Sequence, residues 1–147
     1  MQAPLIVARR ATLDEIFQVR WEVLRPGRPI ETARFPGDDA SETIHFGAFV
    51  DGRNICCATA TRAIWQNNPA WQLRGMGVVS DWQNKGVGQR VLAELEVQVR
   101  QAAELRLIWC NAREEAVKFY EKQGWRVASE SFHIEDVGPH FKMMKDL

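Results

Sequence analysis

The stretch SDWQNKGVGQRVL, Ser80–Leu92, places two glycines directly before an apolar pattern with helical spacing. Glycine is a poor helix former, so Gly86 and Gly88 at the start of a helix need a physical reason. Without a Cβ atom, they let an anion approach the backbone N–H groups closely. A helix N-terminus adds free N–H groups and the positive end of the helix dipole. The stretch therefore predicts a phosphate-binding loop, to which Lys85 and Arg90 can add positive charge.

Two better-known phosphate motifs are absent from the chain. The pattern GxxxxGK[ST] fails because no lysine follows the second glycine, and GxGxxG fails because Gly75-Met76-Gly77 leads to Ser80. A protein that binds ATP through this loop is therefore disfavoured, since no magnesium-binding hydroxyl follows Lys85. A plain strand-to-helix turn with incidental glycines remains the simple alternative.

Composition limits the class of protein. The chain has 147 residues and is 46% hydrophobic, which fits a single domain over residues 1–147 with its own core. Lysine plus arginine and aspartate plus glutamate both number 19, which argues against a dedicated nucleic-acid or membrane-surface protein. No stretch approaches the roughly 20 apolar residues of a membrane span, and no signal-peptide pattern is found. We therefore expect a cytoplasmic protein, with Cys56, Cys57 and Cys110 reduced and non-catalytic.

The pattern along the chain predicts alternating strands and helices. A strand, Pro4–Arg10, precedes a helix that begins with a Thr12/Glu15 capping box. The elements expected after the loop Ile30–Glu42 are three antiparallel strands within Thr43–Ser80, a helix through Val87–Val99, a strand Leu105–Cys110, a helix Asn111–Gly124, and two final strands. The crossover between Trp71 and Cys110 should be parallel. This order predicts an α/β (α+β) fold, with a mixed, mostly antiparallel sheet of about six to seven strands flanked by about four helices.

A second segment supports the interpretation of Ser80–Leu92 as a phosphate-binding loop. NAREEAVKFYEKQGW, Asn111–Trp125, follows an apolar strand, with Asn111 as the expected helix N-cap and Gly124 at its end. Together the two segments resemble the GCN5-related N-acetyltransferase (GNAT) superfamily. QNKGVG matches its (Arg/Gln)-x-x-Gly-x-(Gly/Ala) pyrophosphate loop. The matches to its second motif are Asn111, Ala112, Phe119, Tyr120, Gly124 and Trp125.

The resemblance extends over nearly the whole chain, and it is closest to small bacterial members of unassigned substrate. Many of them have alanine at the position of Gly77, so we expect the strand to be looser there. The resemblance implies acetyl-CoA as donor. No metal is expected, because no cluster of His, Asp or Glu has metal-ligand spacing. The residues implied in cofactor binding are Met76, Gly77, Val78 and Val79 along the pantetheine arm; Gln83, Asn84, Lys85, Gly86, Val87, Gly88 and Gln89 around the pyrophosphate; and Asn111, Phe119 and Tyr120.

Acetyl transfer from a thioester to an amine passes through a tetrahedral oxyanion, and the leaving thiolate needs a proton. The N–H of Val78 is the candidate oxyanion donor. Tyr120, the only tyrosine of the chain, is the candidate acid, with simple packing as its alternative role. His140, in a Gly-Pro-His segment that matches the bacterial group, leads the candidate bases. The other candidate bases are Asp81, His45, Glu42, Glu135 and His133.

The predicted function is direct transfer of an acetyl group from acetyl-CoA to a primary amine of a small or amino-acid-like acceptor. A protein or peptide acceptor, and a non-catalytic acyl-CoA-binding module, remain alternatives, as does a homodimer. The acceptor is expected near Ile30–Glu42 and Ile64–Ala70, where Trp65 and Trp71 could line a pocket or simply pack in the core. Arg74 could pair with an acidic acceptor, although pairing with a neighbouring carboxylate is favoured. No nucleic acid or membrane partner is expected.

Overall fold

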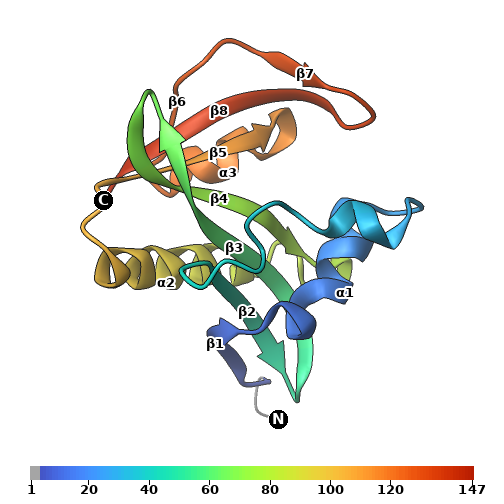
Figure 1. The fold of residues 1–147 in the computed structure, drawn as a ribbon. Helices are drawn as coiled ribbons and strands as arrows, with labels where there is room; N and C mark the ends of the chain where they lie inside the picture. Colours follow the sequence, from blue (N-terminus) through green and yellow to red (C-terminus); the bar gives the residue numbers. More distant parts are fainter. Residues whose placement is uncertain (1–3) are drawn as a thin grey trace.

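The computed structural model describes residues 4–147, so residues 1–3 of the predicted domain lie outside it. Eight strands form one mixed sheet in the order β1-β2-β3-β4-β5-β8-β6, with β7 paired to β8 (Figure 1). The strands are β1 (Ile6–Ala11), β2 (Ile44–Val50), β3 (Arg53–Trp65), β4 (Asn68–Val78), β5 (Leu107–Arg113), β6 (Arg126–Val127), β7 (Phe132–Ile134) and β8 (Gly138–Asp146). Every pairing is antiparallel except that of β4 with β5. The predicted mixed, mostly antiparallel sheet is confirmed.

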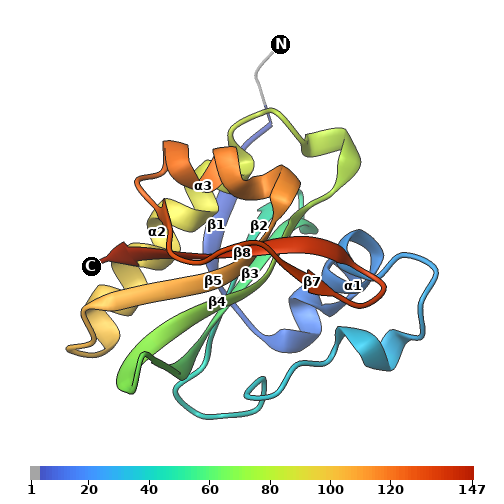
Figure 2. The ribbon, with the colours of Figure 1, turned by 90° about the horizontal axis from the view of Figure 1, so that it is seen from above.

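Three α-helices cover the two faces of the sheet: α1 (Leu13–Leu24), α2 (Val87–Ala102) and α3 (Val117–Lys122). Helix α1 lies on one face, and α2 and α3 lie on the other (Figure 2). The number of α-helices is thus slightly lower than the predicted number of about four, and three short 3₁₀ turns are present in addition, Ile30–Ala33, Ser80–Trp82 and Glu114–Ala116. Among residues 4–147, no helix is both long and apolar enough to cross a membrane.

The sequence signals that set α1 and α2 act as predicted. The Oγ1 of Thr12 accepts a hydrogen bond from the Glu15 N–H at 3.2 Å, and the Glu15 carboxylate accepts one from the Thr12 N–H at 2.9 Å. This capping box satisfies donors that the first turn of α1 leaves free. Along α2, Val91, Leu95 and Val99 are fully buried against the sheet, as their helical spacing requires.

Two tight hairpins shape the meander from β2 to β4. Asp51 and Gly52 have φ of 48° and 81°, the left-handed pair that a two-residue hairpin needs. Gln66 and Asn67 repeat this geometry with φ of 47° and 68°, and β4 therefore begins at Asn68. The predicted acceptor loop Ile64–Ala70 is thus wrong, because all but these two turn residues belong to paired strands.

The C-terminal third differs from the prediction in two places. Asn111 is not a helix N-cap: β5 continues through it to Arg113, and α3 begins only at Val117. Pairing with the long strand β8 extends β5 this far, because Asn111 lies opposite Lys142. The first of the two final strands is split into β6 and β7, while β8 pairs with three other strands.

The parallel pair in the middle of the sheet is very short. Only Trp71 with Ile108 and Gln72 with Trp109 are in register. Beyond Gln72 and Trp109, β4 continues to Val78 and β5 continues to Arg113 without pairing to each other. The two strands therefore separate and leave one edge of β4 open inside the sheet.

Candidate active site

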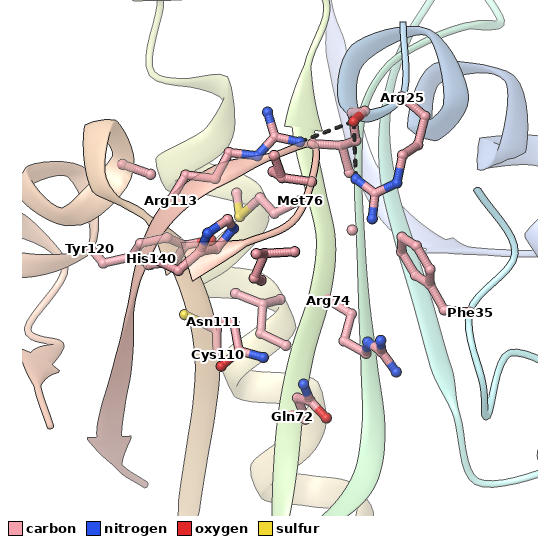
Figure 3. A pocket seen from close by; sticks show the side chains of 17 residues that line it. Arg25, Phe35, Gln72, Arg74, Met76, Cys110, Asn111, Arg113, Tyr120 and His140 are labelled. Atoms are coloured by element: carbon pink, nitrogen blue, oxygen red, sulfur yellow. Dashed lines mark hydrogen bonds between the residues drawn. The ribbon is translucent and has the colours of Figure 1, made fainter. Parts of the chain in front are cut away.

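A cavity of about 200 Å³ lies where β4 and β5 separate. Its walls come from β4, β5, α3, the end of α1, the loop around Phe35 and the β7–β8 hairpin. In the close-up, Tyr120 and His140 lie on one side of β4, and Arg25 and Phe35 lie on the other (Figure 3). Segments from the whole chain thus meet at one opening.

A β-bulge shapes β4 at this opening. The register with β3 shifts between Cys57 and Thr59, and Gly75 within the bulge has φ of 62°. Glycine takes this conformation without strain. At Gly77, glycine is needed for a different reason, which is close packing. A Cβ there would lie 2.8 Å from Cγ1 of Val23, because α1 packs directly on the backbone of β4. The missing Cβ permits this close contact between helix and strand.

The backbone N–H of Val78 faces the open edge of β4. The N–H of Val79 donates to the carbonyl of Ile55 at 3.0 Å. In an antiparallel ladder this bond makes Cys56 and Val78 a pair without mutual hydrogen bonds, so the Val78 N–H points away from β3. The Val78 carbonyl is satisfied by the side-chain amide of Gln83 at 3.0 Å. A donor directed to this edge is what the predicted oxyanion role of Val78 requires.

The predicted phosphate loop turns into α2 through two left-handed residues, Asn84 with φ of 61° and Gly86 with φ of 78°. Gly86 is the N-cap of α2 and, as a glycine, has no side chain that could accept a hydrogen bond from the first turn. The first hydrogen bond of the helix runs from the Arg90 N–H to the Gly86 carbonyl. The N–H groups of Val87, Gly88 and Gln89 therefore have no partner within the helix. This end of α2 carries no acidic residue, so its electrostatics suit an anion.

The side chains around this loop have different surroundings. Gly88 is buried, and a Cβ there would lie 3.4 Å from Val78 and 3.5 Å from Phe119, which joins the loop to the β4 edge and α3. Lys85 is exposed, 5.2 Å above the ring of Trp82. The expectation that Arg90 adds charge to the loop is wrong, because its guanidinium donates to the Ile6 carbonyl at 2.9 Å and lies 3.7 Å from Glu94.

Tyr120 on α3 lines the cavity and is 7% exposed. Its ring packs between Phe119 and Trp125, with both centroid distances 5.2 Å. Burial raises the pKa of Tyr120 well above its ordinary value, and the neighbouring thiols Cys110 and Cys56 act in the same direction. The hydroxyl therefore keeps its proton throughout the neutral range.

The three cysteines are buried and free. Burial raises the pKa of Cys110 to about 12 and that of Cys57 to about 12, and it raises the pKa of Cys56 still further. A thiol nucleophile requires the thiolate form, which these values exclude near neutrality. The prediction that the cysteines are non-catalytic is consistent with this environment.

Asn111 and His140 both line the cavity from the paired strands β5 and β8. The Asn111 side-chain oxygen accepts a hydrogen bond from Nζ of Lys142 at 3.0 Å. His140 is 4% exposed, and its Nδ1 lies 2.8 Å from the Gly138 carbonyl. That contact requires a proton on Nδ1, so in the neutral form of the ring Nε2 would be the acceptor.

The other five candidate bases do not line the cavity. Asp81 pairs with Arg53 at 2.9 Å on the surface, and Glu42 bonds Ser41. His45 is buried between the Thr59 hydroxyl at 2.9 Å and the Asp38 carbonyl at 3.0 Å. His133 and Glu135 are exposed on and beside β7. Of the six candidates, only His140 reaches the opening.

The tryptophans expected near the acceptor take other positions. Trp71 is fully buried in the core. Trp65 packs against Trp109 at 5.4 Å near the tip of the β3–β4 hairpin, away from the cavity. The pocket-lining alternative is therefore wrong for both at this cavity, and the loop Ile30–Glu42 contributes Phe35 instead.

Sequence reasoning missed two charged residues of the cavity, Arg25 and Arg113. Arg113 donates to the Leu24 carbonyl at 3.0 Å, and Arg25 donates to the same carbonyl at 3.0 Å. They therefore meet at the end of α1 although they are far apart in the sequence (Figure 3). In the sequence, the proline and glycine after Arg25 indicate only that the helix ends near Arg25. No sequence pattern indicates that Arg113 lies close to this helix end. Within residues 4–147, no group of three or more His, Cys, Asp or Glu side chains could hold a metal ion.

Comparison with known proteins agrees with this geometry. A family model described as the acetyltransferase (GNAT) domain matches residues 33–147. In Bacillus subtilis (strain 168), the uncharacterized N-acetyltransferase YitI is 27% identical over 146 residues, covering 97% of each chain. The uncharacterized N-acetyltransferase YjcF of the same organism is 35% identical over 143 residues, covering 97% of this chain and 98% of that protein.

A solved structure has the same fold. Aminoglycoside 6′-N-acetyltransferase complexed with coenzyme A superposes with a TM-score of 0.76 at 14% identity, over 95% of this chain and 96% of that one. The family model covers most of the chain, and the relatives cover nearly all of it. The chain belongs to the GNAT acetyltransferase family, and it is an acetyltransferase.

Proposed function

We propose that the protein transfers the acetyl group of acetyl-CoA directly to a primary amine of a small acceptor, in a ternary complex. The observation that carries this proposal is the open edge of β4, which ends at the Val78 N–H and leads to the free N–H groups of α2. An extended pantetheine arm can add to such an edge as a strand does. The structural relative with coenzyme A bound has the same fold.

The open edge of β4 and the start of α2 together offer a place for each part of the donor. The pyrophosphate would lie at Gln83–Gln89, where the left-handed Asn84 and Gly86 turn the backbone N–H groups toward it. The pantetheine would follow Met76–Val79, with Asn111 and Phe119 beside it. The thioester would then lie near Tyr120, which lines the cavity.

The chemistry follows from this placement. The Val78 N–H would donate to the carbonyl oxygen of the thioester, where negative charge develops during attack. The thiolate that leaves would take the proton of the Tyr120 hydroxyl. Burial raises the pKa of that hydroxyl, but it raises the pKa of a thiol in the same place as well, as Cys110 shows at about 12. Proton transfer between the two groups is therefore better balanced than their values in water suggest.

His140 is the proposed group that takes the proton from the amine. Its ring is nearly buried beside the cavity, and with a proton on Nδ1 its Nε2 would be the nitrogen that takes the proton. Replacement by glutamine should remove this basic nitrogen while keeping a polar side chain of similar reach. We expect kcat to fall, whereas acetyl-CoA affinity should not change.

The size of the cavity supports a small acceptor. Its volume is about 200 Å³, and the loop at Phe35 and the β7–β8 hairpin at Ile134 and Val137 both contribute to its walls. The experiment that tests the proposal measures thiol release from acetyl-CoA with amines, amino acids, polyamines and peptides, and identifies the product by mass spectrometry. Turnover of small amines supports the proposal. Binding of acetyl-CoA without turnover of any acceptor would contradict it.

A further inference from the structure

The cavity is lined by three arginines, Arg25, Arg74 and Arg113, and by no aspartate or glutamate. Arginine stays protonated in proteins, so each one brings a full positive charge to the opening. Charges that are removed from water are normally paired. The charge balance at the cavity is therefore unusual for a chain with equal numbers of acidic and basic residues.

None of the three guanidiniums has a carboxylate partner among residues 4–147. Arg25 and Arg113 share the Leu24 carbonyl, and Arg74 reaches only the Pro36 carbonyl at 3.5 Å. A guanidinium has five N–H donors, so most of them remain available. These arginines are not held by the fold in the way that a structural ion pair would hold them.

The nearest buried carboxylate is already neutralised. Asp38 receives two hydrogen bonds from Arg20, at 2.7 and 3.1 Å, and both side chains are buried. The prediction that Arg74 pairs with a neighbouring carboxylate is thus wrong. Burial lowers the pKa of Arg74, the charge of Asp38 opposes this shift, and the charge of Arg20 adds to it. Burial together with Arg113, Arg28, Arg74 and Arg20 lowers the pKa of Arg25, so the positive charges around Arg25 repel one another.

The Phe35 ring, which also lines the cavity, lies beside two of these arginines. Its centroid lies 5.1 Å from Arg74 and 5.5 Å from Arg25, and Figure 3 shows Arg74 extending from β4 toward it. The phosphates of the donor do not explain the charge, because no residue of Gln83–Gln89 lines the cavity. The positive charge of the three arginines is therefore available to bind the second substrate, the acceptor.

We infer that the acceptor is an anionic amine, a small molecule that carries a carboxylate or phosphate group which Arg74, Arg25 and Arg113 bind while its amine points toward Val78 and Tyr120. This inference rests on the proposed function and names its substrate class. The same charges favour the reaction, because a positive field lowers the pKa of an ammonium group and so supplies the neutral amine that attacks. They also disfavour polyamines, which carry only positive charge.

The test compares matched acceptors in the thiol-release assay at fixed ionic strength: an amino acid with its amide, and an aminoalkyl phosphate with the corresponding amino alcohol. The anionic member should have the higher kcat/KM by about ten- to a hundredfold, the size of one charge-assisted hydrogen bond. The better of the two anions identifies the charged group. Equal use of charged and neutral acceptors, or a preference for polyamines, would overturn the inference and leave acetyl transfer in place.

Variants test whether the arginines of the cavity cause the preference for an anionic acceptor. Arg74→Gln should raise KM for the anionic acceptor at least tenfold and lower the preference for the anionic over the neutral acceptor by a similar factor. Arg62→Gln is the matched control, because Arg62 on the neighbouring strand lies over Trp71 at 5.0 Å and does not line the cavity. A loss of the same size in both variants, or in neither, would refute the assignment.

A binding measurement makes the test independent of turnover. Calorimetry on the protein with coenzyme A bound compares an N-acetylated amino acid with its amide. Tighter binding of the carboxylate supports the inference even if no acceptor is turned over, and equal binding contradicts it. Failure to bind coenzyme A at all would instead be a failure of the proposed function.

Discussion

Replacement of Tyr120 by phenylalanine isolates one atom of the proposed mechanism. The ring contacts to Phe119 and Trp125 remain, and only the hydroxyl is removed. General acid catalysis contributes about 10²–10⁴-fold to a rate, or roughly 2.7–5.5 kcal/mol of activation free energy. Because Tyr120 is only 7% exposed, water has little access to replace the lost proton donor. We therefore expect the upper half of that range, about 10³-fold or more in kcat.

The assay has three parts. Thiol release at saturating acetyl-CoA and acceptor gives kcat, calorimetry gives the affinity for acetyl-CoA, and a rapid-quench burst experiment establishes that chemistry limits the rate. Affinity should stay within about threefold of wild type, since the packing surface is unchanged. If kcat also stays within about threefold while chemistry is rate-limiting, Tyr120 is not the acid. If affinity and kcat fall together, its role is to pack on the cofactor.

The direction of the pKa shift adds an independent check. A general acid works while it is protonated, so its activity falls only as pH rises through its pKa. Burial places the pKa of Tyr120 well above 10. The kcat profile should therefore show no descending limb from Tyr120 below about pH 10. A limb below that value which disappears in Tyr120→Phe would contradict the buried, protonated hydroxyl described above.

Three further predictions concern other parts of the chain. Gly86→Asp should weaken coenzyme A binding at least tenfold relative to Gly86→Asn by calorimetry, because both residues tolerate the left-handed φ of 78° and differ mainly in charge; equal affinities would exclude a phosphate at this loop. Asp38→Asn should lower the free energy of unfolding by about 3 kcal/mol in urea, since it leaves Arg20 buried with an uncompensated charge. The exposed neighbour Asp39→Asn should be close to wild type, and similar losses in both variants would refute the reasoning. The three buried thiols, with pKa values raised by burial, should resist iodoacetamide at pH 8 in the folded protein and react after denaturation. Rapid labelling of the folded protein, followed by mass spectrometry, would contradict this.

The local sequence signals predicted the elements well because their causes are local. The Thr12/Glu15 box and the Asp51-Gly52 turn each depend on a few adjacent residues. The Gln66-Asn67 turn is harder to locate from the sequence, because it contains no glycine and pairing of the flanking strands holds both residues at positive φ.

The part of the candidate site that depends on local sequence could likewise be predicted. The glycine loop and Tyr120 lie in motifs that can be read along the chain. Asn111 was assigned to a helix because its residue type favours an N-cap, whereas pairing with the distant β8 keeps it in a strand. The arginine cluster depends on contacts such as that of Arg113 with Leu24, which are 89 positions apart, and no pattern within one segment encodes them.

The short parallel pairing of β4 with β5 has a mechanical consequence. Two registered residue pairs join the β1–β4 part of the sheet to the part formed by β5, β8 and β6. A ligand held between β4 and β5 contacts both parts, so its binding must be coupled to any hinge motion between them. Such a ligand occupies the position of a strand between β4 and β5 while it is bound. Amide hydrogen exchange at the N–H groups of Leu73–Val78 that face the open edge, such as that of Val78, would then report occupancy directly, since these groups are protected only when something lies against them.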